Sequence, residues 1–164
     1  MKNNTKPQIL DSGDRTEFST GAVRDMREGK GRCDLLPLDI VDYLLNGSQV
    51  NIFTRIHQFQ NTSDIVYLIL ALDNFNGQQG WNIQTMFLEV AKHFEEGAKK
   101  YGENNWQKGI PVRYYIDSAI RHYLKWLRGD QDEPHDRAFC WNIVCAIWTC
   151  KHKPELNDYR KDEK

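Results

Sequence analysis

Apolar residues recur at helical spacing along three segments in the second half of the chain. Between Asn82 and Tyr101 they return every three or four positions, as on the buried face of a helix. This stripe contains Ile83, Phe87, Val90, Ala91, Phe94, Ala98 and Tyr101. A second stripe, from Val112 to Arg128 and ended by Gly129, contains Val112, Tyr115, Ile116, Ala119, Ile120, Tyr123 and Leu127. A third helix is predicted to open at Pro134, and its apolar residues on nearly all sides are typical of a central helix.

The first half of the chain has a weaker pattern. A short helix is predicted from Leu38 to Leu45, since Asn46-Gly47 is a common C-terminal stop. Between Val50 and Phe75, apolar stretches flank the cap-like segment Asn61-Thr62-Ser63-Asp64, which predicts two short helices. The whole pattern therefore predicts an all-α fold.

One domain, residues 19–152, should contain these helices, with residues 47–80 as a candidate insertion. Residues 1–18 are polar and unpatterned, so we expect a mobile N-terminal arm there. Residues 153–164 should form a polar C-terminal tail. The glycine-rich segment from Ser19 to Pro37 is expected to be an ordered but irregular loop.

Composition narrows the function classes. The chain has 22 Lys and Arg against 23 Asp and Glu, so no basic surface argues for duplex nucleic acid. The longest apolar run, Ile65 to Leu72, is too short to cross a membrane, and the polar start lacks a signal peptide. We expect a cytoplasmic protein. Cys140, Cys145 and Cys150 are spaced to point to different sides of one helix, so free thiols are expected and a shared zinc is not.

Acidic and basic residues gather around the three predicted helices. The acids are Glu95, Asp117, Asp132, Glu133 and Asp136, and the cations are Lys100, Lys108 and Arg121. Carboxylates are the ligands that Mg²⁺ prefers, and cations can neutralise the remaining charge of a phosphate ester. This mixture favours a metal-bound phosphate ester as the ligand.

Each of these residues also has a purely structural interpretation. Glu95 could be a solvated border residue, and Asp117 with Arg121 an ordinary i, i+4 pair. Asp132, Glu133 and Asp136 surround a helix N-terminus, where the macrodipole stabilises acids without catalysis.

Three further positions leave two interpretations open. Asn142 repeats with His135 and Thr149 every seven residues, which could make a pocket floor or a hydrogen-bonded core bridge. Trp106 could stack on a base or anchor its loop. Lys30 lies in a glycine-rich stretch that could contact phosphate or be a surface turn, because it does not match a P-loop.

An ordered set of short motifs resembles the phage-associated dATP/dGTP diphosphohydrolase family. The motifs are Thr20-Gly21-Ala22-Val23-Arg24, Gly29-Lys30-Gly31-Arg32, Asp34-Leu35-Leu36-Pro37, Gly97-Ala98-Lys99-Lys100-Tyr101-Gly102, Asn105-Trp106, Lys108-Gly109-Ile110-Pro111, Asp117-Ser118-Ala119, Arg121-His122, Asp132-Glu133, His135 and Trp141-Asn142. The resemblance implies a MazG-like all-α bundle that binds Mg²⁺ or Mn²⁺ and releases pyrophosphate. It also implies a homo-oligomer, in the host cytoplasm if phage-encoded.

The chain departs from the MazG-like pattern in two places. Within the helical region only Glu133 to Asp136 has the ExxD spacing, and no ExxE occurs there. Residues 47–80 match no family motif and could be a lid, an oligomer contact or a packing insertion.

We therefore expect hydrolysis of dGTP or dATP to the monophosphate and pyrophosphate. The expected metal ligands are Glu95, Asp117, Asp132, Glu133 and Asp136, of which Glu95, Asp117 and Glu133 are also the candidate catalytic acids. The expected substrate contacts are Lys30, Arg32, Lys100, Asn105, Trp106, Lys108, Arg121, His122, His135 and Asn142.

Two alternatives remain open from the sequence. An HD-type phosphohydrolase is suggested by the adjacent His135 and Asp136, with His93 and His122 upstream. A helical module that binds a nucleotide or a protein without turnover is the other.

Overall fold

The computed structural model describes residues 9–46 and 51–161. In these residues the chain forms six α-helices, three short 3-10 helices and one antiparallel pair of strands, which confirms the all-α fold. The helices are α1 (Leu38–Asn46), α2 (Ile52–Thr62), α3 (Val66–Gln79), α4 (Ile83–Tyr101), α5 (Val112–Arg128) and α6 (His135–His152). The short elements are β1 (Arg15–Glu17), β2 (Val23–Asp25), η1 (Cys33–Leu35), η2 (Asn105–Lys108) and η3 (Pro154–Leu156).

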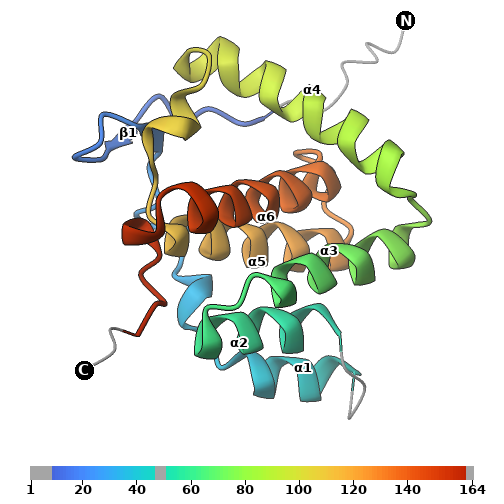
Figure 1. The fold of residues 1–164 in the computed structure, drawn as a ribbon. Coiled ribbons are helices and arrows are strands. Elements are labelled where there is room, and N and C mark those ends of the chain that lie inside the picture. Colours follow the sequence, from blue (N-terminus) through green and yellow to red (C-terminus); the bar gives the residue numbers. More distant parts are fainter. Residues whose placement is uncertain (1–8, 47–50, 162–164) are drawn as a thin grey trace, which may run out of the picture.

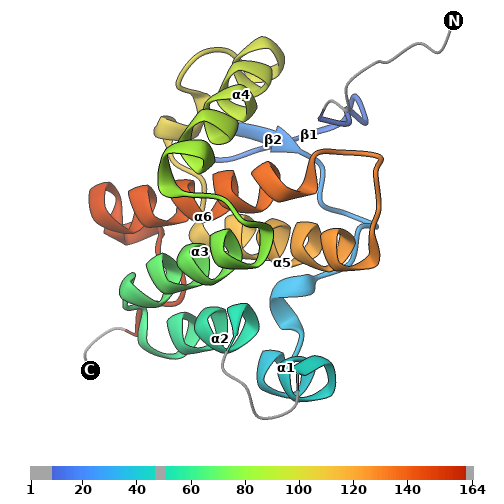
Figure 2. The same cartoon turned by 90° about the vertical axis from the view of Figure 1, so that its right-hand side faces the viewer.

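The antiparallel helices α5 and α6 form the centre of the molecule. In both views α1, α2 and α3 lie on one side of this pair, and α4 lies on the other (Figures 1 and 2). The β1–β2 hairpin lies on the same side as α4 (Figure 2). α4 lies at one edge of the bundle. Its inner face and the face of α6 that it contacts are therefore suited to line a ligand-binding site.

Aromatic packing fixes α2 and α3 to the central pair. The Phe75 ring of α3 lies 4.6 Å from Phe139 and 5.8 Å from Tyr123, measured between ring centroids. Phe53 of α2 lies 5.1 Å from Tyr123. The described part of the candidate insertion, residues 51–80, therefore supplies core packing, which is one of the three roles considered for it.

The predicted helix boundaries agree closely with the structure in the second half of the chain. Asn82 caps α4, because its Oδ1 accepts from the Thr85 amide at 2.8 Å. α5 has the predicted bounds, and Gly129 ends it in the left-handed conformation at φ 84°. Pro134 precedes α6 as its N-cap instead of being its first helical residue.

The expected N-terminal arm is partly built into the fold. Residues 15–17 of the arm form β1 and pair with β2, in the register Arg15 with Asp25 and Glu17 with Val23. Three-residue strands carry no usable periodicity, so the sequence pattern did not predict them. Residues 1–8 lie outside the described part of the chain.

The expected polar tail also packs against the bundle. Tyr159 lies 5.6 Å from the Phe59 ring of α2, and the Arg113 amide at the start of α5 donates to Asp158 Oδ1 at 2.8 Å. These partners are distant in sequence, which is why the local composition suggested only a solvated tail.

Two global expectations can be compared with the structure. No helix in the described residues is long and apolar enough to cross a membrane. The four cysteines are free, with Cys140 and Cys145 buried, as the sequence predicted. Burial raises the pKa of Cys150 to about 12, so that thiol remains protonated at neutral pH.

Candidate functional site

A pocket with a cavity volume of about 980 Å³ lies between α4, α5, α6 and the segment that leads from residue 9 to residue 30. This volume is in the usual range for small-molecule sites. The lining cations are Arg24, Arg27, Lys30, Arg121 and Lys125. The lining aromatic residues include His93, Phe94, Tyr101, Trp106, Tyr114 and Trp141. The combination suits a ligand that has both a flat ring and an anionic group.

Arg24 of β2 reaches across the pocket to Asn142 of α6. Its Nη2 donates to Asn142 Oδ1 at 2.5 Å, and its guanidinium lies over the rings of Tyr115 and Trp141, at 5.1 and 5.7 Å from their centroids. Burial lowers the pKa of Arg24 from its ordinary value. Its Nη1 is buried and has no hydrogen-bond partner among the described residues. An unpaired buried guanidinium nitrogen is costly, so this atom favours an anionic ligand.

Other unpaired polar atoms come from residues that line the same pocket. His93 Nδ1, Arg27 Nη1 and Trp141 Nε1 are buried and lack hydrogen-bond partners within residues 9–46 and 51–161. Burial, with the positive charges of Arg137 and Arg24, lowers the pKa of His93 to about 3. Its imidazole is therefore neutral near pH 7 and can donate or accept a hydrogen bond.

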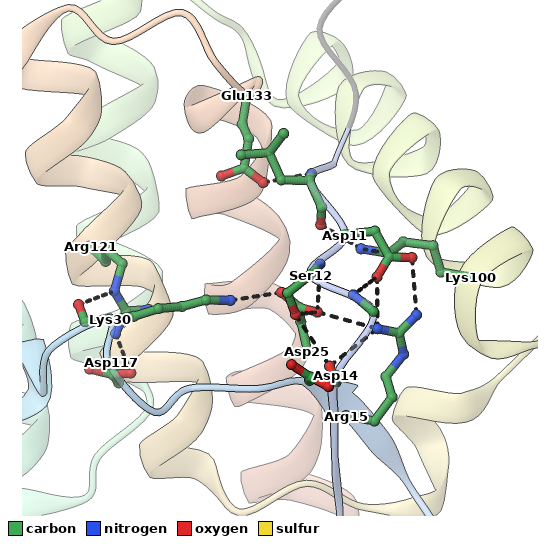
Figure 3. Close-up of polar contacts among 12 residues, drawn as sticks. Asp11, Ser12, Asp14, Arg15, Asp25, Lys30, Lys100, Asp117, Arg121 and Glu133 are labelled. Atoms are coloured by element: carbon green, nitrogen blue, oxygen red, sulfur yellow. Dashed lines mark hydrogen bonds and ion pairs between the residues drawn. The ribbon is translucent and has the colours of Figure 1, made fainter.

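One wall of the pocket is held by ion pairs from the glycine-rich loop. Lys30 Nζ donates to Asp25 Oδ2 at 2.7 Å, and Ser12 Oγ donates to the other oxygen of Asp25 at 2.8 Å (Figure 3). Arg121 Nη2 donates to Asp117 Oδ2 at 2.6 Å and to the Gly31 carbonyl at 2.8 Å. Asp117 is buried, so Arg121 both neutralises it and positions the loop.

A short strap, residues 9–12, lies along the pocket. The Leu10 amide donates to Glu133 Oε1 at 2.9 Å, and the Leu10 carbonyl accepts from Lys100 Nζ at 2.6 Å. The Ile9 amide donates to Glu96 Oε2 at 3.2 Å. Figure 3 shows Glu133 and Lys100 on either side of this strap. The sequence analysis placed these residues in a mobile arm, but here they contact two acids beside the pocket.

The structure does not gather the five expected metal ligands around one point. Glu95 is 67% exposed and pairs with Lys99 at 2.8 Å, which lowers the pKa of Glu95. Asp117 is occupied by Arg121, and Asp136 Oδ1 accepts from the Arg137 amide at 2.7 Å. These residues keep the structural roles that the sequence analysis considered for them.

Glu133, Asp132 and two histidines do come together where α5 meets the start of α6. His122 Nδ1 lies 2.9 Å from His135 Nδ1, and His135 Nε2 lies 2.7 Å from Asp132 Oδ1. The described chain contains two groups of three potential metal ligands. The ligand atoms within each group lie within 4.8 Å of one another, and neither group contains three of the expected acids. One group is His122, Glu133 and His135, and the other is Asp130, Asp132 and His135.

The pKa values of His122 and Asp132 in this cluster are shifted for different reasons. Burial, followed by the charge of His135, lowers the pKa of His122 well below its ordinary value. Burial raises the pKa of Asp132, but hydrogen bonds from His135 and Lys125 outweigh it and hold that pKa at about 2. Asp132 is therefore ionised near neutral pH.

The expected substrate contacts divide into pocket residues and structural residues. Those that line the pocket are Lys30, Asn105, Trp106, Arg121, His122 and Asn142. Arg32, Lys100, Lys108 and His135 do not line it. Arg32 is bound to Asp34 through two bonds of 2.7 and 2.6 Å, and Lys108 is exposed.

Two of the expected substrate contacts, Asn105 and Trp106, have structural roles in the pocket. Asn105 clamps β2, because it accepts from the Val23 amide at 2.9 Å and donates to the Val23 carbonyl at 2.7 Å. Trp106 packs between Phe94 and Trp148, with centroids at 5.1 and 4.8 Å. Both residues thus build the wall of the pocket.

Sequence reasoning missed Arg24, Asp25, Arg27 and Glu96 as site residues. Arg24 closes one of the motifs that carried the family resemblance, and this was the signal that could have identified it. Glu96 pairs with Arg137 and binds the strap, whereas the neighbouring Glu95 was selected.

Comparison with models of known protein families gives a match in the second half of the chain. Residues 82–159 match the family model described as dATP/dGTP diphosphohydrolase, N-terminal. The match begins at the cap of α4 and includes α5, α6 and η3, so it covers one part of the pocket and leaves Arg24 and Lys30 outside. No curated protein and no solved structure matches the chain.

Proposed function

We propose that this chain hydrolyses a purine deoxynucleoside triphosphate, dGTP or dATP, to the monophosphate and pyrophosphate. The description of the matched family names both nucleotides and a diphosphohydrolase. A relationship to MazG-like pyrophosphohydrolases, the phage association and a homo-oligomeric state belong to the same proposal.

The observation that carries the proposal is the unpaired, buried Arg24 Nη1 in a pocket that also holds Arg27 and Lys30. Guanidinium groups bind phosphate oxygens through charge-assisted hydrogen bonds. In the proposed reaction a water oxygen bonds to the α-phosphorus, and the bond from that phosphorus to the bridging oxygen breaks. Negative charge then grows on the departing pyrophosphate, where nearby cations stabilise it.

The same pocket also offers groups for the base, beside Arg24. Trp141 has a ring face and an unpaired Nε1 donor, and the neutral His93 has an unpaired Nδ1. A purine carries the ring acceptor N7, which a pyrimidine lacks, so a donor that reaches it would favour purines over pyrimidines. Asn142 is less available to bind the base than expected, because its amide oxygen and its amide nitrogen already form hydrogen bonds within the protein.

Mg²⁺ or Mn²⁺ remains part of the proposal, but the five expected carboxylates do not fit one shared Mg²⁺ shell. Glu95 and Asp117 are each paired with a cation, and Asp136 binds the backbone of its own helix. The side chains of the pocket therefore contribute binding, orientation and charge compensation to the proposed reaction.

The experiment measures the products from each of the eight common nucleoside triphosphates, with a divalent metal and then with excess EDTA. Pyrophosphate from dGTP and dATP, lost in EDTA, supports the proposal. Tripolyphosphate would indicate the HD-type alternative, and no product would indicate a binding module. Equal turnover of dCTP and dGTP would contradict the purine assignment.

Arg24→Gln tests the residue that carries the proposal. We expect kcat/KM for dGTP to fall about 10²-fold, the size typical of losing one charge-stabilising donor. The matched control is Arg128→Gln, since Arg128 is exposed, pairs with Asp130 and lies outside the pocket. Unchanged kinetics in Arg24→Gln, with Tm preserved in both variants, would remove the main support for phosphate binding here.

A further inference from the structure

The two histidine rings at the α5–α6 junction face each other through the same type of atom. The Nδ1 atoms of His122 and His135 are 2.9 Å apart, and the ring planes meet at 39°. Glu133 offers a carboxylate oxygen within 4.8 Å of a nitrogen on each ring. Two nitrogens bound to one metal at about 2.1 Å are separated by roughly 3.0 Å at a right angle and by roughly 3.4 Å at the tetrahedral angle. The observed separation therefore suits two neighbouring ligands of a single ion.

The chain connection keeps these three residues together. α5 ends at Gly129, whose φ of 84° turns the chain, and α6 begins only six residues later at His135. The short link brings the last turns of α5 beside the first turn of α6. His135 is buried, so its ring is held by the surrounding packing.

Asp132 gives the site a second layer. Its Oδ1 lies 2.7 Å from His135 Nε2, which favours a proton on Nε2 and leaves a lone pair on Nδ1. That lone pair faces His122 Nδ1 at hydrogen-bond distance, and a bound metal ion would replace this contact. Carboxylates that bind the far nitrogen of a histidine in this way are common behind metal ligands. Asp132 is itself held by Lys125 at 3.0 Å.

We propose that His122, Glu133 and His135 form a binding site for a first-row transition-metal dication of the Zn²⁺ and Co²⁺ class. Imidazole nitrogen suits these ions, whereas Mg²⁺ prefers a shell of oxygen atoms. Three protein ligands leave at least one position open, as in catalytic metal sites. His122 and Glu133 line the pocket, so that position faces the space proposed for the nucleotide. This inference concerns metal binding alone and stands whether or not the chain hydrolyses nucleotides.

The competing cluster is Asp130, Asp132 and His135, which would use His135 Nε2. Arg128 already binds both oxygens of Asp130, one of them at 2.7 Å. Substitution of His122 should weaken metal binding only if the ion occupies the first cluster. Substitution of Asp130 should weaken it only if the ion occupies the second.

The test titrates Co²⁺ into chelator-treated, full-length protein without nucleotide and follows heat and the visible d–d absorption. We expect one Co²⁺ per chain, competition by Zn²⁺, and no competition by an equal concentration of Mg²⁺. His122→Asn and His135→Asn should each weaken Co²⁺ binding by more than ~10-fold, and Asp132→Asn by about 10–100-fold. Asp130→Asn and the distant His152→Asn are matched controls that should keep the affinity of the unchanged protein.

A measurement on the unchanged protein guards against variants that misfold. Of the five histidines, Zn²⁺ should shift the Nδ1 resonances of His122 and His135 in a nitrogen-detected spectrum and leave the other three in place. Equal Co²⁺ affinity in His122→Asn, or equal displacement by Mg²⁺ and Zn²⁺, would overturn the proposal. Loss of binding in Asp130→Asn with retention in His122→Asn would assign the metal to the other cluster and overturn it as well.

Discussion

Asn142 donates through Nδ2 to the Ala138 carbonyl at 2.8 Å and accepts through Oδ1 from Arg24. The sequence posed a choice between a pocket residue and a core bridge. Asn142 has features of both, because it lines the pocket and is almost fully buried. Its amide fixes Arg24, so its contribution to ligand binding would act through that guanidinium.

We expect Asn142→Ala to lower stability and activity together. Leaving the buried Arg24 Nη2 without its acceptor should cost about 1–3 kcal/mol of unfolding free energy. It should also lower kcat/KM for dGTP, because the guanidinium is no longer oriented. Asn157→Ala is the control: it removes an acceptor from the Tyr159 amide outside the pocket, so Tm should fall while kcat/KM is retained. Urea unfolding and steady-state kinetics on both variants separate the effects, and an unchanged Tm for Asn142→Ala would contradict this account.

Trp106 is predicted to matter for stability more than for base recognition. Its ring fills the space between Phe94 and Trp148, so Trp106→Ala should leave a void and cost about 3 kcal/mol. Trp106→Phe keeps a ring in the same place and should recover most of that loss. Thermal unfolding of the two variants provides the measurement. A wild-type Tm with a uniformly raised KM would instead favour stacking on the base.

Candidate residue types could be read from the sequence, but their partners could not. Glu95 and Glu96 are adjacent, and about 100° of helix rotation separates them. The structure turns Glu95 to solvent, where it meets Lys99, and turns Glu96 toward Arg137. Since that rotation depends on how α4 docks on α6, local sequence alone could not decide between the two acids.

At the scale of elements, the strap formed by residues 9–12 is held by exposed or half-buried polar contacts. Lys100 Nζ binds the Leu10 carbonyl, while Glu133 and Glu96 bind two strap amides. Ser12 also binds Asp25, and Asp11 binds Arg15. Segments held by such polar contacts open locally at lower free energy than segments held by buried apolar packing. The strap is therefore the part of the pocket wall that should respond most to a single substitution.

We expect Lys100→Met to loosen this strap, because it removes the donor to the Leu10 carbonyl. Amide hydrogen exchange at Ile9 and Leu10 should become faster, while exchange in the middle of α5 stays unchanged. Lys99→Met is the matched control, since Lys99 is exposed and pairs with Glu95. Equal exchange rates at the strap in the two variants would show that the Lys100 contact does not hold it.

The elements that the sequence predicted best are those whose order comes from their own periodicity. α4 and α5 appear with the expected ends, because their apolar stripes and terminal residues act locally. β1 and β2 pair with each other, but each has only three residues, which is too short to show a periodicity.

At the scale of the whole molecule, burial gives His93 a different pKa in the folded protein than in the unfolded chain. Its ring lies 5.1 Å from Trp141, and the nearby cations are Arg137 on α6, Arg24 on β2 and Lys100 on α4. Burial comes first and these positive charges second in lowering the pKa of His93 from 6.5 to about 3. In the unfolded chain these influences disappear, so the pKa returns to its ordinary value.

This difference predicts how stability depends on pH. Above pH 6.5 His93 is neutral in both the folded and the unfolded state, so it contributes no pH dependence. Between pH 6.5 and about pH 3, His93 is protonated in the unfolded state but stays neutral in the folded state. Stability should therefore fall as the pH drops through this window, by about 2 kcal/mol between pH 7 and pH 5 from His93 alone. His93→Phe keeps a ring beside Trp141 but cannot titrate, so its unfolding free energy should lose that much less over the same interval. His57→Phe, on α2 and away from the pocket, should retain the pH dependence of the unchanged protein. Urea unfolding at pH 7, 6 and 5 gives the slopes, and parallel curves for His93→Phe and the unchanged protein would mean that His93 is protonated alike in both states.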